Sequence, residues 1–78
     1  MKIEIYGKNN CSHCEFAKNL INQLVENYTF YNLSENINLK NELADRMGKT
    51  PQSVPQIFVN DDFIGGLSEF RKYIKRIK

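Results

Sequence analysis

The fold is decided by the stretch KIEIYGKNNCSHCEFAKNLINQLVENYTFYN (residues 2–32), in which the spacing of apolar residues changes twice. Residues 2–6 alternate between apolar and polar side chains, and this predicts a short strand ended by Gly7. From residue 12 to about residue 27 the spacing becomes that of one helical stripe, made by Ala17, Leu20, Ile21, Leu24 and Val25. Residues 28–33 are rich in aromatic side chains and predict a second strand. A strand, a crossover helix and a strand predict two parallel strands with a right-handed connection.

The rest of the chain predicts a second helix, a hairpin and a third helix. Ser34 and Asn36 offer capping oxygens to a helix that Gly48 ends, and its apolar stripe is made by Leu39, Leu43 and Met47. Strands at residues 56–59 and 63–64 are joined by a tight turn, so they must be antiparallel. The last helix shows the apolar stripe of Phe70, Tyr73, Ile74 and Ile77. The order β-α-β-α-β-β-α predicts an α/β fold with a mixed four-stranded sheet flanked by three helices.

Size and composition indicate one folded domain over residues 1–78. A chain of 78 residues with 41% hydrophobic and 26% charged residues can build one small core, and we expect nearly all large apolar side chains inside it. A net charge of +2 is too small to indicate a nucleic-acid partner. The sequence has no apolar run of the ~18–20 residues that cross a bilayer, and residues 1–5 show no apolar signal region before the first predicted strand. We therefore expect a cytoplasmic protein with no membrane partner.

Both cysteines, Cys11 and Cys14, lie two residues apart at the start of the first predicted helix, with the sole histidine, His13, between them. Zinc held by this chain alone would need four ligands, and no second ligand cluster follows. In the reducing cytoplasm such a pair is typical of redox chemistry. Unpaired N–H groups at the helix start favour the thiolate of Cys11 and lower its pKa from ~8.5 towards ~3.5–7.5. Lys8 can add a nearby positive charge.

Three motifs together resemble a known family. They are Tyr6-Gly7-Lys8-x-x-Cys11-x-x-Cys14, then Ser53-Val54-Pro55-Gln56-Ile57-Phe58, then Gly65-Gly66. Over essentially the whole chain they are similar to the small dithiol glutaredoxins of thioredoxin-like fold. The resemblance implies a glutathione-dependent thiol–disulfide oxidoreductase that acts as a monomer, with Cys11 as the nucleophile and Cys14 as the resolving cysteine. It implies disulfide-containing protein substrates, among which ribonucleotide reductase is frequent in the family.

The resemblance also implies how glutathione is bound. A cis bond before Pro55 would turn the Val54 backbone towards the cysteinyl part of glutathione, like an added strand. Gly65-Gly66 would allow close backbone approach, and the following helix start would offer N–H groups to the γ-glutamyl carboxylate. Lys8 and Gln52 would hold the glycine carboxylate. The implied glutathione-binding residues are Lys8, Cys11, Gln52, Val54, Pro55, Gly66, Leu67 and Ser68.

The chain departs from the family pattern between the cysteines and after the glycine pair. Ser12-His13 stands where the family usually has Pro-Tyr. A partly protonated His13 near Cys11 would stabilise the thiolate, and the alternative is that His13 faces solvent with little coupling. Ser68 stands where the family often has an acidic residue, so Glu69 is the alternative partner for the α-amino group of glutathione.

Two other functions remain open. Glutaredoxins with a serine after the first cysteine sometimes resemble cluster binders, so the resemblance leaves open a dimer in which Cys11 of each subunit and two glutathiones hold a [2Fe-2S] cluster. A small thioredoxin reduced by a reductase protein is the second alternative. Basic residues follow the glycine pair and are interpreted as a solvated helix face, with docking of an acidic protein substrate as the alternative; they are Arg71, Lys72, Lys75, Arg76 and Lys78.

Overall fold

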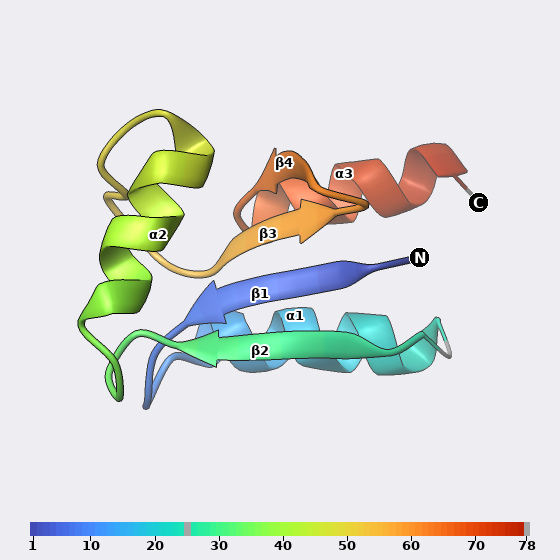
Figure 1. Cartoon of the computed structure of the whole chain (residues 1–78). Helices are drawn as coiled ribbons and strands as arrows, with labels where there is room; N and C mark the ends of the chain where they lie inside the picture. The colour runs from blue at the N-terminus through green and yellow to red at the C-terminus, as the bar shows by residue number, and fades with distance from the viewer. Residues whose placement is uncertain (25, 78) are drawn as a thin grey trace.

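One mixed sheet of four strands organises the chain, of which the computed structural model describes residues 1–24 and 26–77 (Figure 1). The elements are β1 (Ile3–Gly7), α1 (Ser12–Gln23), β2 (Tyr28–Asn32), α2 (Asn38–Met47), β3 (Gln56–Val59), β4 (Asp62–Gly65) and α3 (Leu67–Ile77). The strand order is β2-β1-β3-β4. β1 pairs with β2 in parallel, and the β1–β3 and β3–β4 pairs are antiparallel. The predicted element order and both predicted strand pairings are confirmed.

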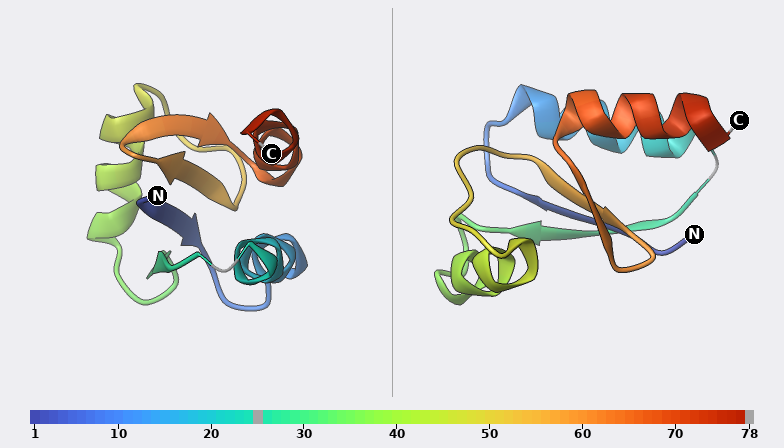
Figure 2. Two further views of the ribbon diagram at one scale, coloured as in Figure 1. Left: turned by 90° about the vertical axis from the view of Figure 1, so that its right-hand side faces the viewer. Right: turned by 90° about the horizontal axis from the view of Figure 1, so that it is seen from above.

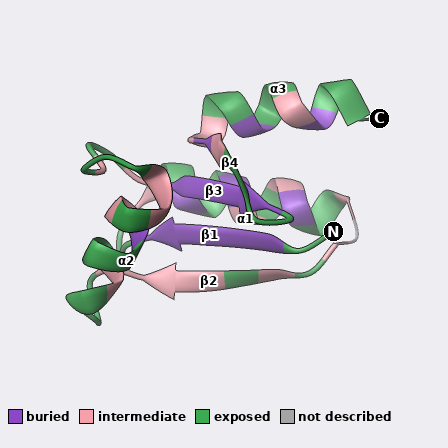
Figure 3. Cartoon of the chain, turned by 45° about the horizontal axis from the view of Figure 1, so that its top comes forward, coloured by how far each residue is buried: buried purple, intermediate pink, exposed green. Residues whose placement is uncertain are grey.

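Helices cover both faces of this sheet. Figure 2 shows α1 and α3 side by side on one face and α2 alone on the other. Figure 3 shows that the central strands β1 and β3 are buried along their length, whereas β2 at the edge is only partly buried. The core under α1 and α3 consists of Ile3, Ile5, Ala17, Ile21, Ile57, Val59, Phe70 and Ile74. A second, smaller core under α2 consists of Tyr6, Leu43 and Phe58.

A buried ion pair fixes α2 on its face of the sheet. Glu4 on β1 is only 5% exposed, and both of its carboxylate oxygens accept hydrogen bonds from the Arg46 guanidinium, at 3.0 and 3.2 Å. The same guanidinium donates to Tyr6 Oη at 2.9 Å and lies over the Phe58 ring, 3.9 Å from its centroid. The Tyr31 hydroxyl donates to Glu4 at 3.1 Å. Every oxygen of the buried carboxylate therefore has a donor.

The ion pair also sets the charge states in this small core. Hydrogen bonds from Arg46 hold the pKa of the Glu4 carboxyl below its usual range, although burial opposes this shift. Burial raises the pKa of Tyr6 to about 12, so its hydroxyl stays protonated and donates to Glu42 at 2.9 Å. The buried Glu4–Arg46 pair is therefore ionised at neutral pH, and the Tyr6 phenol is neutral.

The ends of two helices differ from the prediction. α1 ends at Gln23 and not near Asn27. Leu24 is its C-cap residue, and the N–H of Leu24 donates to the carbonyl oxygens of Leu20 and Ile21. Val25, part of the predicted stripe, lies outside the described residues. α2 begins at Asn38, and the predicted capping oxygen of Asn36 accepts a hydrogen bond from the N–H of Asn38 at 3.0 Å, although the N-cap residue itself is Ile37. Gly48 ends the helix in the left-handed conformation as predicted (φ 74°). Ser34 instead accepts a hydrogen bond from the backbone of Asn9.

The expectation that nearly all large apolar side chains are inside is wrong. Phe16 is 58% exposed and Ile37 is 82% exposed, while Phe63, Ile77 and Met1 are also on the surface. Phe16 lies one position before the buried stripe of α1, and Ile37 precedes α2 in a loop, so neither can turn towards a core. No helix among residues 1–24 and 26–77 is long and apolar enough to cross a membrane.

Replacing Arg46 with Ala leaves the Glu4 carboxylate buried without its cation. We expect the free energy of unfolding in urea to fall by about 3 kcal/mol. Lys2→Ala is the matched control, because Lys2 pairs with Asp61 at 3.1 Å on the surface, with 61% and 69% of the two side chains exposed. That loss is expected to be much smaller than the loss in Arg46→Ala, because solvent screens an exposed ion pair. Equal losses in the two variants would contradict the assigned role of Arg46.

Candidate active site

The two cysteines lie at the N-terminus of α1 and form the Cys11–Cys14 disulfide, with their Cα atoms 5.2 Å apart. Cys11 is the N-cap residue of α1, and its Sγ accepts a hydrogen bond from the N–H of Cys14 at 3.2 Å. Cys14 is fully buried, whereas Cys11 is partly exposed. The sequence therefore places Cys11 before the helix and Cys14 in its first turn, as predicted. A helix N–H that points at the Cys11 sulfur is the arrangement that favours a thiolate.

Gly7, the last residue of β1, leaves the space that Cys14 occupies. A Cβ atom at Gly7 would stand 2.7 Å from Cys14 Sγ and 2.8 Å from Cε1 of Phe30. Neither distance is sterically possible, so only glycine fits while Cys14 keeps its position. The Asn10 backbone, with φ of 54°, then turns the chain into the helix cap at Cys11.

Two hollows meet at Val54, beside the turn in which the Val54–Pro55 bond is cis, as predicted. The lysine hollow, of about 320 Å³, is lined by Lys8, Leu33, Ser34, Lys40, Pro51, Gln52, Ser53 and Val54. The proline hollow, of about 330 Å³, is lined by His13, Ser53, Val54, Pro55, Gly66, Leu67, Ser68 and Glu69. Both hollows include Ser53 and Val54, so together they form one continuous surface. The loops that carry it lie at the end of the sheet away from the N-terminus (Figure 1).

Seven of the eight predicted glutathione-binding residues line the two hollows, whereas Cys11 lines neither, and their role in binding stays a prediction. Lys8 and Gln52 share the lysine hollow. Val54, Pro55, Gly66, Leu67 and Ser68 share the proline hollow, and His13 reaches it from α1, two residues after Cys11. His13 and Lys8 are both exposed, and their predicted influence on the Cys11 pKa stays a prediction.

The start of α3 closes the proline hollow. The N–H groups of Leu67 and Ser68 belong to the first turn and have no intrahelical acceptor. Glu69 Oε1 accepts a hydrogen bond from the N–H of Gly66 at 2.9 Å, which caps the helix. A Cβ at Gly65, where φ is 125°, would stand 2.8 Å from Glu69 Cβ, so the glycine allows this contact.

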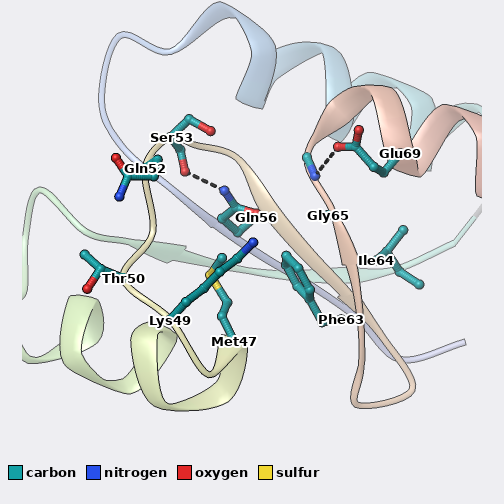
Figure 4. Close-up of a pocket in the computed structure, with 11 residues that line it drawn as sticks. Met47, Lys49, Thr50, Gln52, Ser53, Gln56, Phe63, Ile64, Gly65 and Glu69 are labelled. Carbon is teal, nitrogen blue, oxygen red and sulfur yellow. Dashed lines mark hydrogen bonds between the residues drawn. The ribbon is translucent and has the colours of Figure 1, made fainter.

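A third cavity, the side groove of about 530 Å³, continues from Glu69 along β4 towards the end of α2. Figure 4 shows its polar side chains arriving from the α2–β3 loop on one side and from Glu69 on the other. Gln56 in this groove is buried and donates to the carbonyl of Ser53 at 2.8 Å. This bond holds the loop that carries Val54 against β3.

Sequence reasoning missed Lys40 and Ser53. Lys40 lies in the lysine hollow with Lys8, and nothing in the sequence indicates it, because α2 supplies it from the opposite face of the sheet. Ser53 lines all three cavities, and its position directly before the Val-Pro turn was the available signal. Among residues 1–24 and 26–77, no three His, Cys, Asp or Glu side chains gather as metal ligands.

A cysteine pair at a helix start, beside a cis-Pro turn on a mixed sheet, defines a thiol–disulfide oxidoreductase of thioredoxin-like fold. The glutaredoxin family model matches residues 3–64, and the chain belongs to this family. It is 31% identical over 80 residues to glutaredoxin 1 of Escherichia coli strain K12, covering 96% of this chain and 94% of that protein. The glutaredoxin of Haemophilus influenzae is also 31% identical, with 96% and 92% covered.

A solved structure gives the same result for the fold. The reduced glutaredoxin of Escherichia coli superposes with a TM-score of 0.84 at 33% identity, covering 97% of this chain and 95% of that one. The predicted thioredoxin-like fold and the thiol–disulfide oxidoreductase function are confirmed. Dependence on glutathione is the norm in this family.

Gly7→Ala forces Cys14 or Phe30 to move. We expect the free energy of unfolding to fall by about 1–3 kcal/mol, measured in urea, as for other overpacked cores. We also expect the dithiol–disulfide equilibrium of the cysteine pair in a glutathione redox buffer to shift. Gly48→Ala is the control, since its φ is 74° but no atom lies within 4 Å of the added Cβ. That variant should lose about 1 kcal/mol from backbone strain and keep the wild-type redox equilibrium. An unshifted equilibrium in Gly7→Ala would contradict the contact.

Proposed function

We propose that the chain reduces glutathione mixed disulfides and protein disulfides at the expense of glutathione, with Cys11 as nucleophile and Cys14 as resolving cysteine. The observation that carries this proposal is the asymmetry of the pair. Cys11 is partly exposed and accepts a helix N–H, whereas Cys14 is fully buried behind it. Only Cys11 can meet a disulfide from solvent, and Cys14 can reach only Cys11.

The reaction follows ordinary thiol–disulfide exchange. The Cys11 thiolate attacks the glutathione sulfur of a mixed disulfide, forms a Cys11–glutathione disulfide and releases the substrate thiolate, which takes a proton from water. A second glutathione thiolate then attacks the bound glutathione sulfur, which yields glutathione disulfide and regenerates the Cys11 thiolate. With a protein disulfide, the Cys11 thiolate attacks one substrate sulfur, forms a Cys11–substrate disulfide and releases the first substrate thiolate. The Cys14 thiolate then attacks Cys11 Sγ, forms the Cys11–Cys14 disulfide and releases the second substrate thiolate. Two glutathiones then reduce the Cys11–Cys14 disulfide.

The hollows support the proposed positions of glutathione. Its glycine carboxylate lies between the cations Lys8 and Lys40 and the amide of Gln52 in the lysine hollow. Its cysteinyl backbone pairs with Val54, which joins the two hollows. Its γ-glutamyl carboxylate accepts from the free N–H groups at Leu67 and Ser68 in the proline hollow. Pro55 and Gly66 line the same proline hollow.

Glu69 is the proposed partner of the γ-glutamyl ammonium group. One carboxylate oxygen accepts from Gly66, and a carboxylate has a second oxygen free to accept another donor. Glu69 also lines the proline hollow, next to Ser68. Ser68 occupies the position at which the family often has an acidic residue.

We further propose that the chain acts as a monomer in the cytoplasm on disulfide-containing proteins, of which ribonucleotide reductase is one candidate. A reducing compartment matches the use of its two cysteines as a redox pair. Coupling to glutathione reductase, and not to thioredoxin reductase, distinguishes this function from that of a small thioredoxin.

The [2Fe-2S] dimer also stays a prediction. Because this chain offers only Cys11 as an accessible thiol ligand, such a cluster would need glutathione and a second copy, and visible absorbance after anaerobic reconstitution tests it.

The division of roles predicts opposite results for the two serine variants. With a small glutathione mixed disulfide and excess glutathione, Cys11→Ser should be inactive, because no other thiolate is accessible. Cys14→Ser should keep at least about half of the wild-type rate, since glutathione itself resolves the intermediate. The measurement is NADPH consumption coupled through glutathione reductase. Activity in Cys11→Ser, or its loss in Cys14→Ser, would reverse the assignment.

Glu69→Gln removes the charge but keeps an oxygen that can cap Gly66. We expect KM for the glutathione mixed disulfide to rise about tenfold, because a charge-assisted hydrogen bond contributes roughly 1.5–3 kcal/mol, while kcat changes little. Glu15→Gln is the matched control at the start of α1, where Glu15 pairs on the surface with Lys18. An unchanged KM in Glu69→Gln would remove Glu69 from the binding site.

A further inference from the structure

An apolar groove of about 410 Å³ lies between α1 and α3, outside the hollows proposed for glutathione. It is lined by His13, Phe16, Leu20, Leu67 and Arg71. The first three follow one another at helical spacing on α1, and the last two are one turn apart on α3. The two helices lie side by side on the same face of the sheet (Figure 2).

Phe16 is the apolar side chain of this groove that belongs to neither core, whereas Leu20 and Leu67 also pack against the core under α1 and α3. The core stripe of α1 is Cys14, Ala17 and Ile21, all fully buried. Phe16 lies beside this stripe and is 58% exposed, although a buried phenylalanine would stabilise the fold. Single exposed apolar residues are normal. Here Phe16 joins the partly buried Leu20 and Leu67 in one groove, so an apolar side chain of a partner could contact all three.

The groove is continuous with the proline hollow. His13 and Leu67 line both the apolar groove and the proline hollow, so these two side chains are the ridge between them. A molecule whose sulfur reaches Cys11 therefore has two surfaces available, one on each side of the ridge. If glutathione occupies the proline hollow, the other half of a mixed disulfide faces the apolar groove.

The rim of the groove is basic. Arg71 has no ion pair within the described part of the chain, and Lys75 follows it one helical turn later, whereas Lys72 and Arg76 line a different cavity. Glu69, the acidic residue of α3, is bonded to Gly66 on the other side of the ridge. The charge that complements this rim is negative.

We propose that the apolar groove docks the polypeptide of a disulfide substrate through an apolar side chain next to carboxylates, close to the reacting cysteine. This inference rests on the proposed function and adds the class of protein substrate. The apolar side chain packs against Phe16 and Leu20, and the carboxylates pair with Arg71. An interface of this size is small and transient, as a substrate that must leave after each turnover requires.

The test compares three mixed disulfides of glutathione. The first carries the peptide Glu-Asp-Leu-Gly-Cys-Gly-Leu-Asp-Glu, which has the same motif on both sides of its cysteine. The second replaces each acidic residue by lysine, and the third carries only 2-mercaptoethanol. The variants are Phe16→Ser and Arg71→Glu. Lys72→Glu is the matched control, because it makes the same charge change on the same helix but lines a different cavity, with Phe63 and Tyr73.

The expected result is specific to the acidic peptide. Phe16→Ser and Arg71→Glu each lower its kcat/KM about tenfold, while kcat/KM for the 2-mercaptoethanol substrate changes less than about twofold. Arg71→Glu raises kcat/KM for the lysine peptide. Lys72→Glu changes each value less than about twofold. Equal effects of Arg71→Glu and Lys72→Glu would overturn the proposal, since they would indicate only long-range steering by net charge.

Binding can be measured without turnover. Titration of the wild-type protein with the acidic peptide carrying serine in place of cysteine should shift the backbone amide NMR signals of Phe16, Leu20, Leu67 and Arg71. Shifts confined to other residues would overturn the docking site, whether or not the variants fold. Sedimentation equilibrium tests a second copy as the occupant, and a dimer abolished by Phe16→Ser would also overturn the proposal. Failure of the proposed function itself would appear separately, as no activity of the wild type on the 2-mercaptoethanol substrate.

Discussion

The attachment of α2 to the sheet is the constraint on which both proposed glutathione hollows depend. This helix lies alone on its face, and its small core contributes one fully buried residue of α2, Leu43. The other contacts that hold α2 against the sheet come from the Arg46 guanidinium, which donates to both oxygens of the buried Glu4 and to the Tyr6 hydroxyl. A buried ion pair adds little net stability compared with an apolar pair, but any displacement of α2 would leave a charge buried and unpaired. The ion pair therefore specifies where α2 lies.

The position of α2 matters because the chain passes directly from this helix to the Val-Pro turn. Gly48 ends the helix, and the loop after it carries Gln52, Ser53 and Val54 into the hollows. α2 also supplies Lys40 to the lysine hollow. The redox pair, in contrast, is fixed from the opposite face of the sheet, where α1 packs. The site thus combines a sulfur pair held by one helix layer with a binding loop held by the other, and Gly7 lets the sulfur pair approach the sheet.

The sequence was sufficient for the element order and the sheet because the apolar spacing changes sharply at Gly7, near residue 28 and at Gly48. It was not sufficient for Glu4, because alternation assigns a residue to a face and does not show whether a helix covers that face. The end of α1 was placed too late since Leu24 continues the apolar pattern from a position that already caps the helix. The exposure of Phe16 could have been predicted, because Phe16 falls outside the stripe of Ala17, Leu20 and Ile21. The expectation that nearly all large apolar side chains are buried led to the opposite prediction.

The geometry of disulfide exchange explains why the site needs both the proline hollow and the apolar groove. A thiolate attacks one sulfur of a disulfide from the side opposite the departing sulfur, so the two halves of the substrate extend in different directions from Cys11. A site with one binding surface could recognise only one half. Here the ridge of His13 and Leu67 separates the proline hollow from the apolar groove. In the proposed function, the proline hollow accepts the half that is common to all glutathione mixed disulfides, and the apolar groove contacts the half that differs between substrates. Selectivity among proteins then resides in Phe16 and Arg71, where substitutions leave the glutathione surface intact.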